Sequence, residues 1–169
     1  MTLRERPLLG RLRDAVPLAL SGWLGAVVLF ATVVAPALFA VLPSRSLAGA
    51  AVSRILPPLF VAGALLGCIA IIAARGIGQP RRARAAIAFS GLLVVCCVIA
   101  QGVVAPAISR TRARMGEVAP AALPASDARR QAFGRLHASS VLALGIGALG
   151  ALGAAVAFTL PGIPRDLQT

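Results

Sequence analysis

The segment Ala15–Leu42 reads AVPLALSGWLGAVVLFATVVAPALFAVL and contains no Asp, Glu, Lys or Arg. It exceeds the roughly 20 residues that an α-helix needs to cross a bilayer hydrocarbon core of about 30 Å. A helix on the surface of a soluble protein keeps a polar face, whereas this segment is apolar on every side. It therefore predicts a transmembrane helix, and this interpretation decides the fold class.

The same pattern occurs four times in the chain. The predicted spans are 15–42, 55–74, 85–109 and 136–160. The chain is 59% hydrophobic and only 13% charged, and the segments outside the spans leave no room for a soluble domain. We predict an all-α polytopic membrane protein, with four transmembrane helices in a compact bundle at 15–160, a basic N-terminal tail at 1–14 and a C-terminal tail at 161–169.

All 17 basic residues are arginines, the formal net charge is +12, and no arginine lies inside a predicted span. Because aromatic residues are not interleaved with the arginines, the pattern favours contact with anionic lipid headgroups over nucleic acid. The short connection with Arg75, Arg81, Arg82 and Arg84 has no acidic residue, which predicts a cytoplasmic location. Both termini then face the cytoplasm of a bacterial inner membrane, although arginines are nearly balanced between the two sides.

A short repeat relates the first and third spans. Val33–Ala37 reads VVAPA, and Val103–Ala107 reads the same. Two spans that run in the same direction would match in this way if a two-helix hairpin had been duplicated. Coincidence in a chain rich in alanine and valine is the alternative. In either case Pro36 and Pro106 are expected to kink or end their helices at the same membrane face.

Small residues at four-residue spacing predict close helix packing, because lipid-embedded helices associate where their backbones can approach. One such pair lies in the second span and one stripe lies in the fourth, and the stripe also suits self-association into a homo-oligomer. The predicted packing residues are Gly63, Gly67, Ser139, Ala143, Gly147 and Ala151.

His137 is the only histidine in the chain and begins the fourth span. It could serve as a metal or haem ligand or as a proton-sensitive group, or it could be an interfacial histidine hydrogen-bonded to Ser140. Arg45 and Arg54 flank the same face, so an anion or a lipid headgroup could be held there. Ordinary interfacial anchoring is the alternative for these arginines.

Three cysteines, Cys68, Cys96 and Cys97, all lie within predicted spans. With His137 they could form a weak site for haem or copper, although a buried free cysteine commonly serves as a small hydrophobic residue. The sequence contains no nucleophile–base set, phosphate loop or zinc spacing. We therefore expect no enzymatic activity and no cofactor. The absence of a carboxylate from every span also argues against a proton-coupled transporter that acts as a monomer.

Several short motifs resemble a known family. They are Trp23–Leu24–Gly25, Val34–Phe39, Ala48–Gly49, Leu59–Phe60, Val104–Pro106, Phe133, Leu136–His137 and Ser140. Together they resemble the bacterial four-span membrane family of unknown function with a DUF4149 domain, related to eukaryotic transmembrane protein 205. The family's asparagine after the His–Ser pair is replaced here by Val141–Leu144. The resemblance implies a four-helix membrane protein without an established reaction.

These observations lead to one main functional hypothesis and two alternatives. The main hypothesis is a small, non-enzymatic inner-membrane protein that self-associates. The alternatives are a metal- or haem-handling protein that uses His137, and a small-solute exporter formed as an oligomer. The face with Pro36, Pro106, Arg45, Arg54 and His137 is the expected working end.

Overall fold

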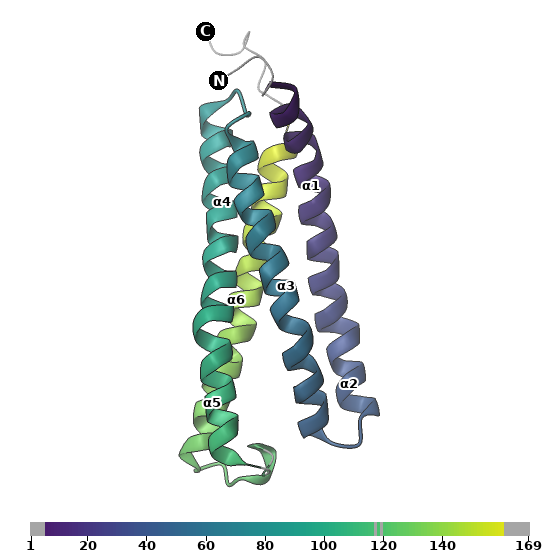
Figure 1. Cartoon of the computed structure of the whole chain (residues 1–169), viewed down its shortest axis with the longest axis vertical. Helices are drawn as coiled ribbons and strands as arrows, with labels where there is room; N and C mark the ends of the chain where they lie inside the picture. The colour runs from purple at the N-terminus through teal and green to yellow at the C-terminus, as the bar shows by residue number, and fades with distance from the viewer. Residues whose placement is uncertain (1–5, 117, 119, 161–169) are drawn as a thin grey trace.

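The computed structural model describes residues 6–116, 118 and 120–160, and this part of the chain is helical throughout apart from short connections (Figure 1). Its elements are α1 (Arg6–Leu29), η1 (Phe30–Val34), α2 (Ala35–Val41), α3 (Arg45–Ala74), α4 (Pro80–Ile99), η2 (Ala100–Val104), α5 (Ala105–Met115), η3 (Pro120–Ala122) and α6 (Ala128–Thr159). The segments 1–5 and 161–169 of the predicted tails lie outside the described residues, as does Glu117. The predicted all-α class is confirmed.

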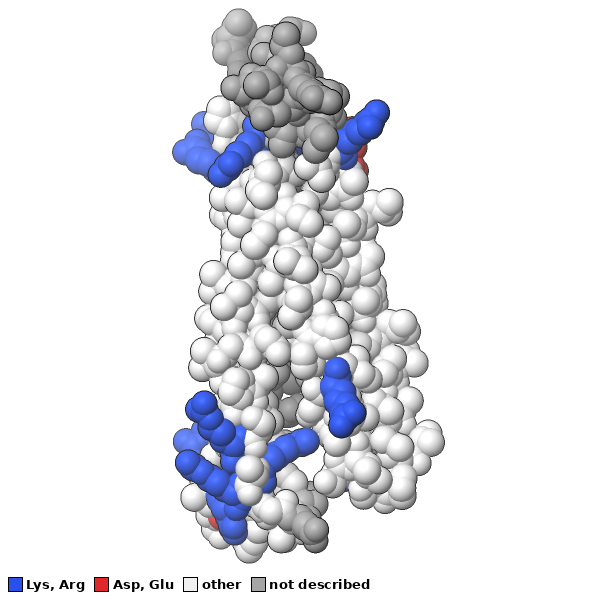
Figure 2. All heavy atoms as spheres, viewed as in Figure 1, with Lys and Arg blue, Asp and Glu red and all other residues white. Residues whose placement is uncertain are grey.

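Four helices are long and apolar enough to cross a membrane: Gly10–Val41, Arg45–Ala74, Pro80–Met115 and Ala128–Thr159. At 1.5 Å per residue, the 30 residues of α3 span about 45 Å, which exceeds the hydrocarbon core and reaches the headgroup layers. Figure 2 shows arginines at both ends of the bundle and an uncharged belt between them. The prediction of a membrane protein with four transmembrane helices is therefore confirmed.

The helix of the second predicted span, α3, begins at Arg45, ten residues before the span start predicted at 55. Ser44 has an extended backbone, and its side chain accepts a hydrogen bond from the Leu47 N–H at 3.2 Å, which caps the helix. Pro57 and Pro58, which directly follow the start predicted at 55, therefore lie inside α3 and not in its first turn. The predicted span starts after the charge of Arg54, whereas the helix itself starts earlier, at the Ser44 cap.

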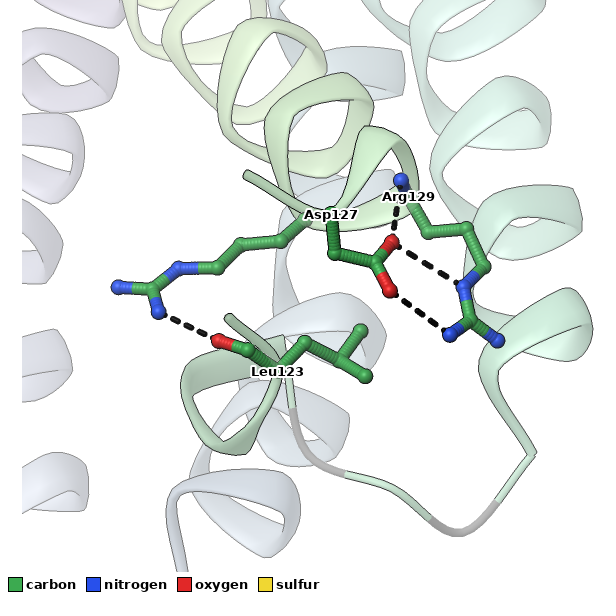
Figure 3. A network of polar contacts seen from close by, with 4 residues as sticks. Leu123, Asp127 and Arg129 are labelled. Carbon is green, nitrogen blue, oxygen red and sulfur yellow. Dashed lines mark hydrogen bonds and ion pairs between the residues drawn. The ribbon is translucent and has the colours of Figure 1, made fainter. Parts of the chain in front are cut away.

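The last helix, α6, is capped by Asp127 (Figure 3). The Asp127 carboxylate accepts from the Arg129 N–H at 2.8 Å and pairs with the Arg129 guanidinium, also at 2.8 Å. These hydrogen bonds hold the pKa of Asp127 at about 2. Arg130 donates to the Leu123 carbonyl at 2.6 Å and ties the α5–α6 connection to α6. Asp127 is therefore ionised and fully occupied by its neighbours at physiological pH.

The core is one continuous cluster in which glycines and alanines let the helices approach. Gly63 of α3 lies under Trp23 and Cys97, and Gly67 lies against Val94 and the Ser90 backbone. On α6, Gly147 and Ala151 belong to the stripe that the sequence singled out. Gly147 faces α4, and Ala151 is fully buried in the core. Ala143 is half-buried, whereas Ser139 is exposed and hydrogen-bonds to the Arg135 carbonyl. Gly147 and Ala151 of this stripe thus pack against helices of the same chain.

The backbones of α4 and α6 approach each other closely at Gly150, which the four-residue spacing did not select. A Cβ atom at this position would lie 2.9 Å from the Phe89 carbonyl oxygen and 3.0 Å from the Leu93 amide nitrogen. At the far end of the same helix, the Arg82 guanidinium donates to the carbonyls of Ala157 and Phe158 at 3.2 Å. It satisfies carbonyls that the helix terminus leaves without partners. Arg82 therefore has a structural role.

The two VVAPA segments have the same local structure. In each, a five-residue π-helical turn precedes the proline, and the alanine before the proline donates its N–H five residues back, from Ala35 to Phe30 and from Ala105 to Ala100. The helix continues past both Pro36 and Pro106. The shared turn supports the proposal of a duplicated hairpin, since it places the same backbone irregularity in both halves.

Candidate functional site

A cleft of about 510 Å³ lies at the end of the bundle formed by α2, the start of α3, α5 and the start of α6. At this end α2 packs against α3, and α5 packs against α6, so that the bundle divides into two arms (Figure 1). Figure 2 shows the surface hollowed between these arms, with arginines beside the hollow. The volume is within the range of about 300–1,000 Å³ that is common for small-molecule sites.

The walls of the cleft change from polar to apolar with depth. Arg45, Arg112 and His137 line it and lie toward the end of the bundle that carries the α2–α3 and α5–α6 connections. Phe30, Leu56 and Leu144 also line it and lie further along their helices, toward the centre. The cleft therefore has a cationic mouth and an apolar interior.

Arg112 of α5 is held at the mouth by contacts from two other helices. Its Nη1 donates to Ser53 Oγ at 3.5 Å, and its Cζ lies 5.4 Å from the centre of the Phe133 ring. Ser53 in turn donates to the Gly49 carbonyl at 2.7 Å. Gly49 is buried directly beneath the guanidinium, and a Cβ atom there would collide with Arg112 Nη2. Arg112 thus bridges the two arms and occupies a space that the missing side chain of Gly49 provides.

His137 continues this arrangement on α6. Its ring stacks on Phe133 with the centroids 6.3 Å apart and an angle of 6° between the planes. Ser140 lines the cleft one turn further along the helix, and the contact that the structure gives for the His137 ring is the stack on Phe133. His137 is exposed at the wall of the cleft, where a bound molecule could reach it.

The π-helical turns deprive backbone carbonyls in each half of their usual α-helical donors, and the Ala31 carbonyl is one of them. An α-type bond to the Ala31 carbonyl would need the Ala35 N–H, which donates to Phe30, and a π-type bond would need Pro36, which has no N–H. The equivalent carbonyl in the other half is that of Gln101. Ala31 lines the cleft, so its carbonyl is a candidate acceptor near the apolar interior.

Comparison with known protein families identifies the chain. The model of a domain of unknown function, DUF4149, matches residues 18–117, which is more than half of the sequence. The chain belongs to the DUF4149 family. Comparisons with curated proteins and with solved structures give no match. The DUF4149 match covers Gly49, Ser53 and Arg112 but ends before α6, so Phe133 and His137 lie outside it.

The structure does not bring the three cysteines of this DUF4149 protein to His137. Cys96 contacts Gly147, which is ten residues or about 15 Å along α6 from His137, and Cys97 packs on Gly63. Cys68 is exposed on α3. No group of three His, Cys, Asp or Glu residues within the described part of the chain could hold a metal ion together. A site that combines His137 with the cysteines is therefore not supported by the geometry.

The remaining predicted residues are divided between the cleft and other surfaces. Arg45 lines the cleft, whereas Arg54 is exposed outside its lining. Gln101 lies in η2, and its side-chain oxygen is buried without a partner among the described residues. Sequence reasoning missed Gly49, Ser53 and Phe133 as parts of a site and treated Arg112 as one of many headgroup arginines. The available signal was the spacing of Gly49 and Ser53, which is one helical turn, in the segment between the first two predicted spans.

Proposed function

We propose that this membrane protein binds an amphiphile from the bilayer, with the chain of the ligand in the apolar interior of the cleft. The observation that carries the proposal is the cleft itself, which divides the bundle where a ligand in the membrane could reach it. Apolar walls of this size bind alkyl chains through burial of apolar surface, worth about 25 cal/mol per Å². The protein would act by binding, without catalysing a reaction.

A cleft-filling substitution tests this proposal. Ala35 lines the cleft, and Ala37, two residues on, is exposed and does not line it. Ala35→Phe is expected to weaken binding of monooleoylglycerol by about tenfold or more, equivalent to the loss of about 1.4 kcal/mol of apolar contact. Ala37→Phe is the matched control and should bind as the wild type does. Native mass spectrometry of the full chain in mild detergent counts the bound molecules. Equal binding by both variants and the wild type would contradict the proposal.

The same preparation separates the other candidate ligands. His137 at the cleft wall is the observation that favours haem, because a single histidine can serve as an axial ligand. A Soret band in the absorption spectrum would make haem the occupant, and stoichiometric copper would make the protein a metal handler. Steady transport of a small solute into vesicles would favour the oligomeric exporter. Self-association remains a prediction, and light scattering of the detergent complex measures it.

We also propose that the protein lies in a bacterial inner membrane with both termini in the cytoplasm and the cleft on the opposite side. The support is the connection between α3 and α4, where Arg75, Arg81 and Arg84 are exposed. Arg82 adds less to this argument, since it caps α6. A cysteine introduced as Gly78→Cys, with the three native cysteines replaced by alanine, should react with an impermeant maleimide only after the inner membrane is opened. Labelling from outside intact spheroplasts would reverse the orientation.

A further inference from the structure

We infer that the amphiphile carries an oxyanion headgroup, phosphate or carboxylate, and that Arg112 binds this group at the mouth of the cleft. The inference rests on the proposed function and specifies its ligand. The same oxyanion chemistry could come from a lipid headgroup or from free phosphate, and the experiment below separates the two sources.

The first argument is the charge of the mouth. Arg45 and Arg112 line the cleft from opposite arms. The ion pairs of the described residues are Arg13 with Asp14 and Arg129 with Asp127, so the one acidic residue described at this end is engaged elsewhere. Two cations beside an apolar wall at the membrane surface favour an anionic occupant, because charges there are less screened than in bulk water.

The second argument is the way Arg112 is held. The planar guanidinium lies over the Phe133 ring, and it passes across Gly49 with one long hydrogen bond to Ser53. A guanidinium has five N–H donors in a fixed fork that matches two oxygen atoms of a phosphate or carboxylate. Contacts that hold the guanidinium at the mouth while leaving donors available prepare it for bidentate binding, at a lower entropic cost than for a freely moving arginine.

The third argument is the direction of the polarity. The cationic residues of the lining are at the outer end, whereas Phe30, Leu56 and Leu144 are deeper. A single-chain anionic lipid would therefore bind with its headgroup at Arg112 and its chain pointing toward the membrane centre. A free anion would use only the outer part of the cleft and leave the apolar interior without a ligand.

Two probes with the same acyl chain test the inference by native mass spectrometry. Oleoyl lysophosphatidate carries an anionic headgroup, and monooleoylglycerol carries a neutral one. We expect the wild-type full chain to bind the anionic probe about tenfold more tightly or better, equivalent to about 1.4 kcal/mol or more, because the guanidinium adds charge-assisted hydrogen bonds to the headgroup. Arg112→Gln should lose this preference and still bind monooleoylglycerol. Millimolar inorganic phosphate should not displace the anionic lipid.

Matched variants keep the test decisive. Arg110→Gln removes an exposed arginine of the same helix and should keep the preference for the anionic probe. Gly49→Ala should reduce the preference by displacing the flexible end of Arg112, whereas Gly145→Ala, with no atom near its Cβ, should not. If Arg112→Gln fails to fold, Gly49→Ala still tests the assignment.

The outcomes separate the two proposals. Equal binding of both probes by the wild type would overturn the headgroup inference and leave amphiphile binding intact. Binding of neither probe would overturn both. Displacement by inorganic phosphate would make the site one for free anions and would overturn the lipid as the source. An unchanged preference in both Arg112→Gln and Gly49→Ala would overturn the role of Arg112.

Discussion

Gly150→Leu is expected to prevent stable assembly of the four-helix bundle, whereas Gly145→Leu on the same helix is expected to leave it intact. The atoms that a Cβ at Gly150 would meet are the Phe89 carbonyl oxygen at 2.9 Å and the Leu93 amide nitrogen at 3.0 Å, both in the α4 backbone. A backbone cannot move aside as a side chain can, so the whole α4–α6 contact would have to open. No atom lies within 4 Å of a Cβ at Gly145.

The effect should grow with the size of the new side chain. Gly150→Ala is expected to reduce stability by about 1–3 kcal/mol, the usual cost of overpacking, and Gly150→Leu by more, because its branched side chain has no space between the helices. Unfolding by denaturing detergent, followed by circular dichroism or by the fluorescence of Trp23, measures both variants against Gly145→Ala and Gly145→Leu. If Gly150→Leu were as stable as Gly145→Leu, the α4 backbone would not lie close to Gly150 of α6.

The number and positions of the four helices could be predicted from the sequence, because each span is a long uncharged segment and the membrane imposes its thickness on length. The helix ends were harder to predict. The segment 45–54 lies between Ser44 and two prolines, and its arginines suggested a connection, yet the Ser44 cap starts a helix there. Charge indicates where a membrane surface lies, but a helix can extend beyond that surface.

The cleft could be predicted only in part. The sequence pointed to the correct end of the bundle through Arg45 and His137, since both lie near span boundaries. It gave no indication that Arg112 crosses to Gly49, because this contact depends on how four helices are rotated against one another. The role of Gly150 could not be predicted for the same reason. Its role comes from the neighbouring α4 backbone and not from a motif in α6.

The rotation of α2 and α5 depends on the two π-helical turns. A π-helical turn adds one residue relative to an α-helix, and one residue corresponds to about 100° of rotation. Each turn precedes a proline, whose missing N–H and ring disfavour the regular α-helical ladder at that point by about 3 kcal/mol. The turns at Phe30–Val34 and Ala100–Val104 therefore determine which faces of α2 and α5 point into the cleft. Arg112 lies on the cleft-facing side of α5.

Replacing both prolines, Pro36→Ala together with Pro106→Ala, is accordingly expected to abolish high-affinity amphiphile binding while the chain remains helical. The new N–H groups can donate to carbonyls one turn earlier, so that both turns can relax to α-helix and turn the cleft-lining residues of α2 and α5 away. We expect the affinity for oleoyl lysophosphatidate to fall by about a hundredfold, equivalent to about 2.7 kcal/mol, which is comparable to the loss of the Arg112 contact and part of the apolar wall.

Pro58→Ala is the control for this double variant, since Pro58 also lies inside a helix but follows no π-helical turn and does not line the cleft. It should bind both probes as the wild type does. Amide hydrogen exchange across residues 30–36 and 100–106 should show increased protection in the double variant as the ladder becomes regular. Unchanged affinity together with increased protection would mean that the π-helical turns do not shape the cleft. Unchanged protection would mean that packing against α3 and α6, and not proline, maintains the turns.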